Sequence, residues 1–234
     1  MNTVACFLWG DWGPGRGLAY LYALQDSVFQ HSTADIRFVC FTDRPARTIR
    51  DTIEVVPLNA DDLEGNLKKM TIFRPCSKLE GKVLALDLDT VIVDRLDVLF
   101  EMKLETNSFV TCEDAYATGR IGGGVHLFMA GFGLSEFWAP LNRSPAIYGN
   151  TMGSERHYLR RRAIELKSDL DLRFWQSQKP SPVVSYKKEC QGGAPTGSRI
   201  IWFHGQPRPH QVTDVAWIDE AWGVHYREYT HGNA

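Results

Sequence analysis

Residues 83–92 read Val-Leu-Ala-Leu-Asp-Leu-Asp-Thr-Val-Ile. The four apolar residues at the start follow a turn signal at 80–82, and such an uninterrupted apolar run is typical of a strand buried on both faces in a parallel sheet. Side chains alternate along an extended strand, so we expect Asp87 and Asp89 to point to the same side. The stretch therefore predicts two carboxylates at the carboxyl end of a central strand, the edge at which open α/β sheets bind ligands.

The acid pair indicates a divalent cation. Two carboxylates this close repel each other and are costly to keep ionised in a half-buried crevice. A hard divalent ion with oxygen ligands offsets that repulsion. The alternative is a pair of capping or solvated acids, which is less favoured because a continuous apolar run seldom delivers two acids to the ligand edge by accident.

The residues before this stretch predict alternating strands and helices. Apolar runs bounded by turn residues indicate strands at 4–9, 36–42 and 52–56, and apolar residues at helical spacing indicate helices at 18–29 and 67–73. This order of strands and helices is typical of one half of a Rossmann-like fold. The glycine-rich loop at 10–17 matches neither G-x-G-x-x-G nor a Walker loop, so it indicates phosphate binding only weakly.

The residues after the stretch predict further elements and one more candidate metal ligand. We expect a short helix at 94–100 capped by Asp94, strands at 109–112, 125–129, 183–187 and 199–203, and a basic helix at 157–166. The last strand ends in His204, which is well placed to complete a metal site with the two aspartates. Taken alone, that residue is equally well interpreted as a surface histidine in a proline-rich loop.

Length, composition and charge predict one soluble domain. The chain has 234 residues, 26 basic and 28 acidic, and no stripe of Lys and Arg stands out except at 160–162, so we expect no nucleic-acid partner. The five cysteines are widely spaced and form no C-x-x-C pair, which favours reduced core residues. No apolar run approaches the roughly 18 residues of a membrane span. We therefore expect no transmembrane segment and a cytoplasmic location.

Several stretches, taken in their order along the chain, resemble a GT-A-fold glycosyltransferase of the family 8 type. They are WG at 9–10, FVCFTD at 38–43, KMTIFRP at 69–75, LDLDTV at 86–91, SYK at 185–187 and FHGQPRPH at 203–210. The resemblance implies one Rossmann-like α/β domain over 1–234, with a mostly parallel central sheet flanked by helices. Its nucleotide-binding half would span about 1–100 and its acceptor-side half about 101–234.

The resemblance also assigns the site residues. It implies that Asp87, Asp89 and His204 bind Mn²⁺ or Mg²⁺ on the diphosphate of a nucleotide sugar. The expected donor is a UDP-sugar and the expected acceptor a carbohydrate or other glycan, as in a hexosyltransferase. The donor-binding residues that it implies are Trp9, Gly10 and Asp43 for the nucleoside, Lys69 and Lys187 for the phosphates, and Leu88 and Gly205 beside them.

Two stretches near the expected sugar site depart from the family pattern. Relatives often carry an Asp-Gln pair after a glycine, and the matching residues here are Ser154 and Glu155. Where relatives often carry Asn-Ser-Gly, this chain has three glycines at 122–124, which would let a ligand approach the backbone closely. Glu155 and Asp89 are therefore the candidate catalytic residues, and the donor sugar and the stereochemical outcome stay open.

Two other classes of protein are compatible with part of the pattern. A haloacid dehalogenase-type phosphohydrolase would use Asp87 as nucleophile and Asp89 as acid and base, but its motif usually opens the chain, and here three predicted strands precede it. A nucleotide-sugar or carbohydrate-binding protein of the same fold without turnover fits the altered residues near Glu155. A transferase is the favoured interpretation, although fold and motif resemblance do not by themselves establish chemistry.

Overall fold

The main sheet is built around β1 (Asn2–Leu8). The computed structural model describes residues 1–12, 15–75, 77–152, 154–212 and 214–230, and within them a seven-stranded sheet has the order β3-β2-β1-β4-β7-β6-β8. Strands β3, β2, β1 and β4 are parallel, β7 is antiparallel to β4 and β6, and β8 is parallel to β6. This arrangement confirms the predicted mostly parallel α/β sheet. The other strands are β2 (Ile36–Thr42), β3 (Glu54–Pro57), β4 (Lys82–Leu86), β6 (Ser108–Asp114), β7 (Ala117–Met129) and β8 (Asp171–Phe174).

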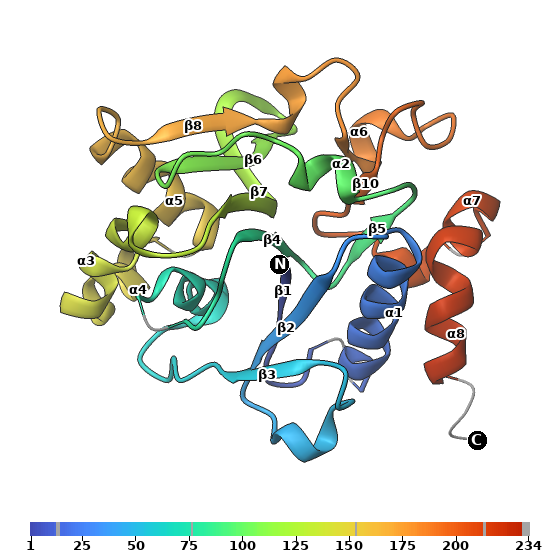
Figure 1. Ribbon diagram of the computed structural model, residues 1–234, viewed down its shortest axis with the longest axis horizontal. Helices are drawn as coiled ribbons and strands as arrows, with labels where there is room; N and C mark the ends of the chain where they lie inside the picture. The colour runs from blue at the N-terminus through green and yellow to red at the C-terminus, as the bar shows by residue number, and fades with distance from the viewer. Residues whose placement is uncertain (13–14, 76, 153, 213, 231–234) are drawn as a thin grey trace.

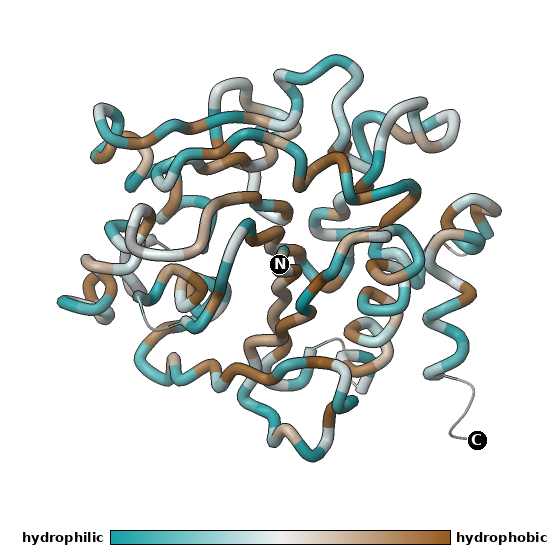
Figure 2. The backbone as a smooth tube through the Cα atoms, in the orientation of Figure 1, coloured by the Kyte–Doolittle hydropathy of each residue, from teal (hydrophilic) through white to brown (hydrophobic). Residues whose placement is uncertain are grey.

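Alternate side chains of the central strands enter two separate hydrophobic layers. On β1, Cys6 and Leu8 pack into one layer, whereas Ala5 and Phe7 pack into the other. Figure 2 shows hydrophobic residues gathered along these central strands. Because both faces are covered, the central residues of these strands, such as 4–8 in β1, are apolar at successive positions instead of alternating with polar residues.

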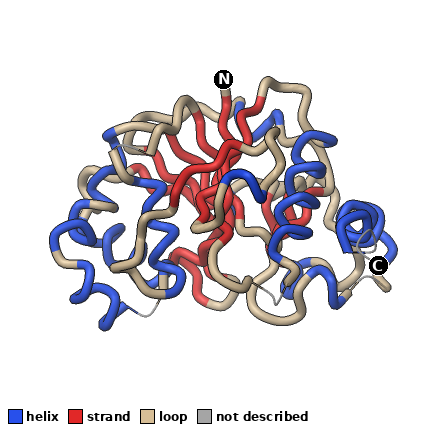
Figure 3. Tube along the Cα trace, turned by 90° about the horizontal axis from the view of Figure 1, so that it is seen from below, coloured by secondary structure: helices blue, strands red, loops and turns tan. Residues whose placement is uncertain are grey.

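Helices cover both faces of the sheet (Figures 1 and 3). On one face, α1 (Gly17–Gln30) packs against α8 (Val224–Thr230). On the other face lie α3 (Ala139–Arg143), α4 (Pro145–Met152), α5 (Glu155–Glu165) and the 3₁₀ helix η2 (Gly65–Phe73). The predicted helices at 18–29 and 67–73 correspond to α1 and η2.

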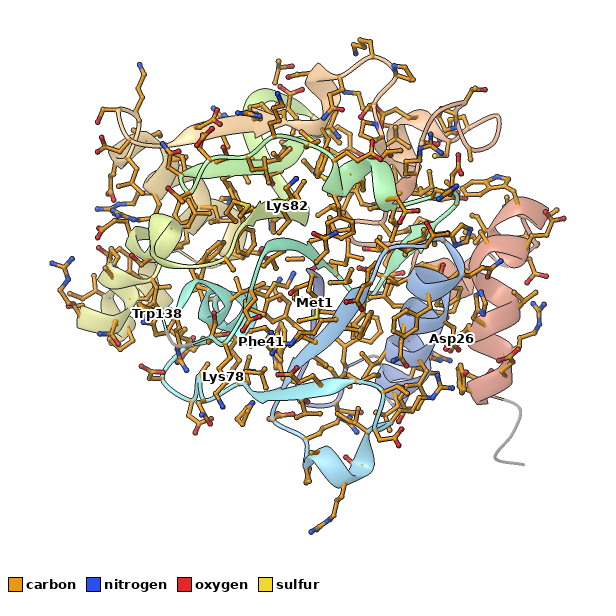
Figure 4. The ribbon with its side chains drawn as sticks, viewed as in Figure 1. Met1, Asp26, Phe41, Lys78, Lys82 and Trp138 are labelled. Carbon is orange, nitrogen blue, oxygen red and sulfur yellow. The ribbon has the colours of Figure 1, made fainter. Side chains whose placement is uncertain are left out.

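The last helix, α8, is held to α1 by a polar contact. Asp26 lies on the side of α1 that faces α8 (Figure 4). Its carboxylate accepts a hydrogen bond from the hydroxyl of Tyr229 and pairs with Arg50 at 2.9 Å. The far end of the chain thus returns to the first helix.

The chain leaves the main sheet after Leu86, so the extended conformation from which we expected Asp87 and Asp89 to point to the same side is not present. Residues 87–89 form a turn in which Thr90 N–H donates to the Asp87 carbonyl at 3.2 Å. The next strand, β5 (Thr90–Ile92), belongs to a second sheet with β10 (Ile200–Trp202) and β9 (Val183–Ser185). The two acids therefore lie where the chain crosses from one sheet to the other.

Other predicted elements differ in their bounds. Strand β7 begins at Ala117 and includes the three glycines, because they allow it to bend while staying paired with β6. Asp94 does not cap a helix: its carboxylate accepts from Arg95 N–H at 2.7 Å and pairs with Arg199. The remaining elements are α2 (Asp97–Phe100), α6 (Tyr186–Glu189), α7 (Ala216–Ile218), η1 (Ala46–Thr48), η3 (Phe132–Phe137), η4 (Trp175–Ser177), η5 (Pro209–Gln211) and η6 (Asp219–Gly223).

Four of the five cysteines lie within the described residues. Cys6, Cys40, Cys112 and Cys190 are buried and free, which confirms the interpretation of these four as reduced core residues. Cys76 lies outside the described residues. None of the helices in the described part of the chain has the length and apolar character needed to cross a bilayer.

Candidate functional site

A cavity of about 480 Å³ lies at the carboxyl ends of β1 and β4. Two central parallel strands end there, so their following residues turn toward the same crevice. The glycine-bearing part of β7 and the residues after β10 form its other walls. The predicted site residues that line it include Trp9, Lys69, Asp87, Asp89, Glu155 and His204.

Each aspartate of the acid pair contacts a cationic side chain. The ammonium group of Lys69 pairs with Asp87, and the guanidinium of Arg208 pairs with Asp89. Burial and the neighbouring Asp87 raise the pKa of Asp89, although Arg208 and Lys69 act against this rise. The turn thus brings two carboxylates together in a buried place where additional positive charge is stabilising.

Glu155, the first residue of α5, is buried behind the acid pair. One carboxylate oxygen lies 3.0 Å from Lys69 Nζ and the other 3.0 Å from His126 Nε2. Burial by itself would raise the pKa of Glu155, but Lys69 and His126 outweigh it and hold the pKa below its usual range. Glu155 is therefore ionised at neutral pH although it is only 6% exposed.

His204 follows β10 on the opposite wall of the cavity. Its Nε2 lies 2.9 Å from the hydroxyl of Ser185. Burial and the charge of Lys187 lower the pKa of His204, so the imidazole is neutral at pH 7. Gly205 has φ +69°, and a Cβ there would lie 3.6 Å from Lys187 Nζ. The structure therefore brings three residues predicted at the phosphate end together.

The residues predicted for the nucleoside lie at the end of β1. Trp9 and Leu88 line the cavity. Gly10 follows Trp9 in the chain, and its N–H donates to the Asp43 carboxylate at 2.9 Å. Arg44 in turn donates to the Gly10 carbonyl at 3.2 Å. These contacts tie the loop after β1 to the loop after β2.

Gly124 determines how closely β7 approaches the acid pair. Its carbonyl accepts a hydrogen bond from Asp87 N–H at 3.0 Å, and its φ of +88° is strongly unfavourable for other residues. A Cβ at this position would lie 3.2 Å from the ring of Trp202 and 3.9 Å from Asp87 Oδ2. Both the backbone conformation and the short distance to Trp202 therefore require a glycine at this position.

The three residues predicted as metal ligands line one cavity but do not surround one point. Among the residues that the structure describes, no three His, Cys, Asp or Glu side chains are grouped so that they could hold a metal ion. In kind, two carboxylates and a neutral imidazole fit Mn²⁺ or Mg²⁺, and the burial that, together with the charge of Asp87, raises the pKa of Asp89 makes a bound cation favourable there. The three-ligand site stays a prediction.

Comparison with known proteins gives structural matches only, since no family model and no curated protein matches the chain. The galactosyltransferase LgtC, in complex with donor and acceptor sugar analogues, matches with a TM-score of 0.64 and 16% identity over 96% of each chain. An active-site mutant of LgtC gives the same TM-score at 15% identity, over 96% of this chain and 95% of that one. The glycosyltransferase GlyE of Streptococcus pneumoniae TIGR4 matches with a TM-score of 0.62 and 14% identity, over 99% of this chain and 64% of GlyE.

The chain has a glycosyltransferase fold. At these identities the likeness concerns the fold and leaves the chemistry to the residues of the site. It confirms the GT-A-like architecture expected from the sequence, whereas the relation to the family 8 type stays a prediction.

Two polar contacts at the cavity were not predicted from the sequence. Arg208 pairs with Asp89, and His126 contacts Glu155. A signal existed for each, because Arg208 follows the His-Gly motif by three residues and His126 interrupts an otherwise apolar strand. Neither signal shows by itself which acid the side chain meets across the fold.

Two buried polar atoms at the cavity also lack a protein partner. Within the described residues, Ser154 Oγ and Trp202 Nε1 make no hydrogen bond, and both residues line the cavity. A buried polar group left unsatisfied costs about 1–3 kcal/mol. A polar ligand or water in the cavity would remove that cost, which favours a binding site here.

Proposed function

We propose that the protein is a metal-dependent glycosyltransferase that moves a sugar from a nucleotide sugar, with UDP as the nucleotide, to a carbohydrate or other glycan acceptor. The observation that carries this proposal is the convergence of Asp87 and Asp89 in a cavity at the carboxyl edge of a glycosyltransferase-like sheet. LgtC has been crystallised with donor and acceptor sugar analogues, which supports the same two kinds of ligand for this chain.

Asp87, Asp89 and His204 would hold the divalent ion. When bound, the ion would supply Lewis-acid stabilisation of the negative charge on the departing diphosphate. The protein's own cations add to this: Arg208 and Lys69 already lie against the acid pair, and Lys187 lies beside Gly205. Positively charged groups held at the site of developing negative charge lower the barrier without reorganisation.

The other side of the cavity suits the sugar. Glu155 offers a fixed carboxylate that can accept hydrogen bonds but cannot donate them. As the bond from the anomeric carbon to phosphate breaks, positive charge develops on the sugar, and a buried carboxylate nearby stabilises it. By the family resemblance, Glu155 stands where an amide is common, so this chain places a full negative charge at that point.

Turnover assays test the proposal. The native protein is incubated with a panel of UDP-sugars and, separately, with p-nitrophenyl phosphate, each with Mn²⁺ and with a chelator. We expect release of UDP from at least one UDP-sugar in Mn²⁺, loss of that release in chelator, and no hydrolysis of the phosphate ester. Hydrolysis of the ester alone would indicate a phosphohydrolase, and UDP binding without turnover would indicate a binding protein.

A further inference from the structure

A line of hydrogen-bonded side chains runs from β6, the strand next to one edge of the main sheet, through β7 to Glu155. Thr111 on β6 and His126 on β7 are directly opposite in the antiparallel register, which brings their side chains together. Thr111 Oγ1 lies 2.8 Å from His126 Nδ1, and His126 Nε2 lies 3.0 Å from Glu155 Oε1. Two strands and a helix thus contribute one residue each to a buried line that ends at the cavity.

The partners determine where the imidazole carries its proton. A carboxylate only accepts hydrogen bonds, so Nε2 of His126 carries the hydrogen that is donated to Glu155. In the neutral ring, Nδ1 then accepts from the hydroxyl of Thr111. The ring also stacks on Phe109, with centroids 5.0 Å apart, and His126 is 6% exposed. Packing and hydrogen bonds together fix both the tautomer and the orientation of the ring.

The charges around Glu155 make this contact necessary. Lys69, from η2, is the ammonium group that reaches Glu155, and it also pairs with Asp87 at the end of β4. One cation is thus shared by two carboxylates. Arg156 lines the cavity next to Glu155 but makes no ion pair with it among the described residues. The N–H of His126 is therefore the second group that stabilises the buried charge.

We propose that His126, oriented by Thr111, is a positioning residue that keeps the Glu155 carboxylate ionised and directed at the donor sugar. This role rests on the function proposed above, because it gives Glu155 a sugar to face. His126 is not one of the residues that line the cavity, and it acts through Glu155, which does line it. The same carboxylate in a cavity without this histidine would take up a proton more easily and could turn toward Lys69 alone.

Matched substitutions distinguish a positioning role of His126 from a role in packing alone. His126→Phe keeps a ring against Phe109 but removes the donor, whereas His126→Gln restores an N–H donor. Thr111→Val keeps the shape of the side chain and removes the hydroxyl. Thr3→Val is the control, since Thr3 is buried in β1 and donates to the Glu80 carbonyl, away from the cavity.

For His126→Phe we expect turnover of the UDP-sugar to fall about ten- to a hundredfold, while the Mn²⁺-dependent affinity for UDP changes by less than about twofold. The pH at which the Glu155 carboxyl itself titrates should rise, because Glu155 loses a donor to its ionised form. His126→Gln should recover part of the turnover, Thr111→Val should show a smaller loss in the same direction, and Thr3→Val should leave turnover unchanged. Native-like turnover in His126→Phe, with Glu155→Gln impaired, would overturn the proposal.

Two spectroscopic measurements test the role of His126 independently of turnover. The first needs only the native protein, so it also applies if a variant fails to fold. In ¹⁵N spectra of the native protein, His126 should carry its proton on Nε2, and a proton on Nδ1 alone would overturn the proposal. In a ¹³C titration, the Glu155 carboxyl should stay ionised to lower pH in the native protein than in Thr111→Val or His126→Phe, and identical titration curves would also overturn it. If the native protein turns over no UDP-sugar but these spectra are as expected, the proposed function fails and the orienting contact stands.

Discussion

Glu155 is a carboxylate with one donor on each oxygen, and in the proposed function its charge faces the donor sugar. Replacement by glutamine keeps the size and removes the charge. We expect Glu155→Gln to lower turnover of a UDP-sugar roughly a hundredfold, because the amide no longer stabilises positive charge on the sugar. UDP affinity in Mn²⁺ should change little, since the nucleotide contacts lie elsewhere.

Glu165 provides the control for this substitution. It lies on the same helix and pairs with Arg161 and Arg162 instead of facing the cavity. We compare Glu155→Gln with Glu165→Gln by steady-state kinetics, which give turnover, and by UDP titration, which gives affinity. Equal turnover in native protein and Glu155→Gln would reduce Glu155 to a structural partner of Lys69.

Gly124 is the other residue whose identity the site requires. Gly124→Ala places a methyl group 3.2 Å from Trp202 in a left-handed backbone conformation, so we expect about 1–3 kcal/mol loss of stability and weaker UDP binding. Gly119 is the matched control, because it lies on the same strand with φ +76° and open space around it. Urea unfolding should show a smaller loss for Gly119→Ala, with UDP binding unchanged. Equal losses of stability and of UDP binding in both variants would show that backbone strain, and not the contact with Trp202, causes the effect.

Among the elements, the short helix α2 is tied to the loop after α1 by Asp97. The Asp97 carboxylate accepts from Ser32 Oγ at 2.8 Å and from the backbone N–H groups of Thr33 and Ala34 at 3.1 and 3.0 Å. Partial burial alone would raise the pKa of Asp97, but these donors and Arg95 lower it strongly. Because the folded-state pKa lies below the unfolded one, the contribution to stability is present above about pH 4 and is lost as the pH falls further.

Asp97→Asn tests this contact. We expect the variant to lose about 1.5–3 kcal/mol of unfolding free energy at pH 7, the usual contribution of a hydrogen bond to a charged group. The difference from the native protein should narrow as the pH falls from 4 toward 2. Urea unfolding at pH 7 and at pH 3 measures both values. A difference that stays constant or grows at low pH would contradict the assigned role.

Several elements could be predicted from residue patterns because each pattern reports a local cause. The apolar runs of β1, β2 and β4 are buried on both faces, and the helical spacing in α1 reflects one packed face. The turn at 87–89 could not be predicted, because its order of acidic, apolar and acidic residues is equally compatible with an extended strand. Only the pairing of β5 with β10, more than 100 residues later, shows that the chain changes sheet there.

The same limit applies to the site. The positions of Asp87, Asp89 and His204 in one cavity could be predicted, because each follows an apolar run that indicates a strand, although β4 and β10 belong to different sheets. The contact of His126 with Glu155 depends on the register of β7 and the start of α5, which no local pattern encodes. For the same reason the sequence did not show that Lys69 would be shared by two acids.

For the whole molecule, the two hydrophobic layers hold a mostly parallel sheet, and the cavity at its carboxyl edge contains acids and cations in contact with each other. Acids come from the crossing between the two sheets, and cations come from η2 and from the loop after β10. A diphosphate with a divalent ion fits such a place, because the ion meets the acids and the phosphates meet the cations. The division into a nucleotide-binding half and an acceptor-side half stays a prediction.

Calorimetric titration of the native protein with UDP, in Mn²⁺ and then in chelator, tests the proposed metal-dependent nucleotide site most directly. We expect affinity at least about tenfold higher in Mn²⁺, with Asp89→Asn and His204→Ala losing most of that gain because they remove metal ligands. Asp94→Asn should behave like the native protein, since Asp94 pairs with Arg199 outside the cavity. Equal UDP affinity with and without the metal, or a loss in Asp94→Asn as complete as that in Asp89→Asn, would contradict the metal-dependent nucleotide site.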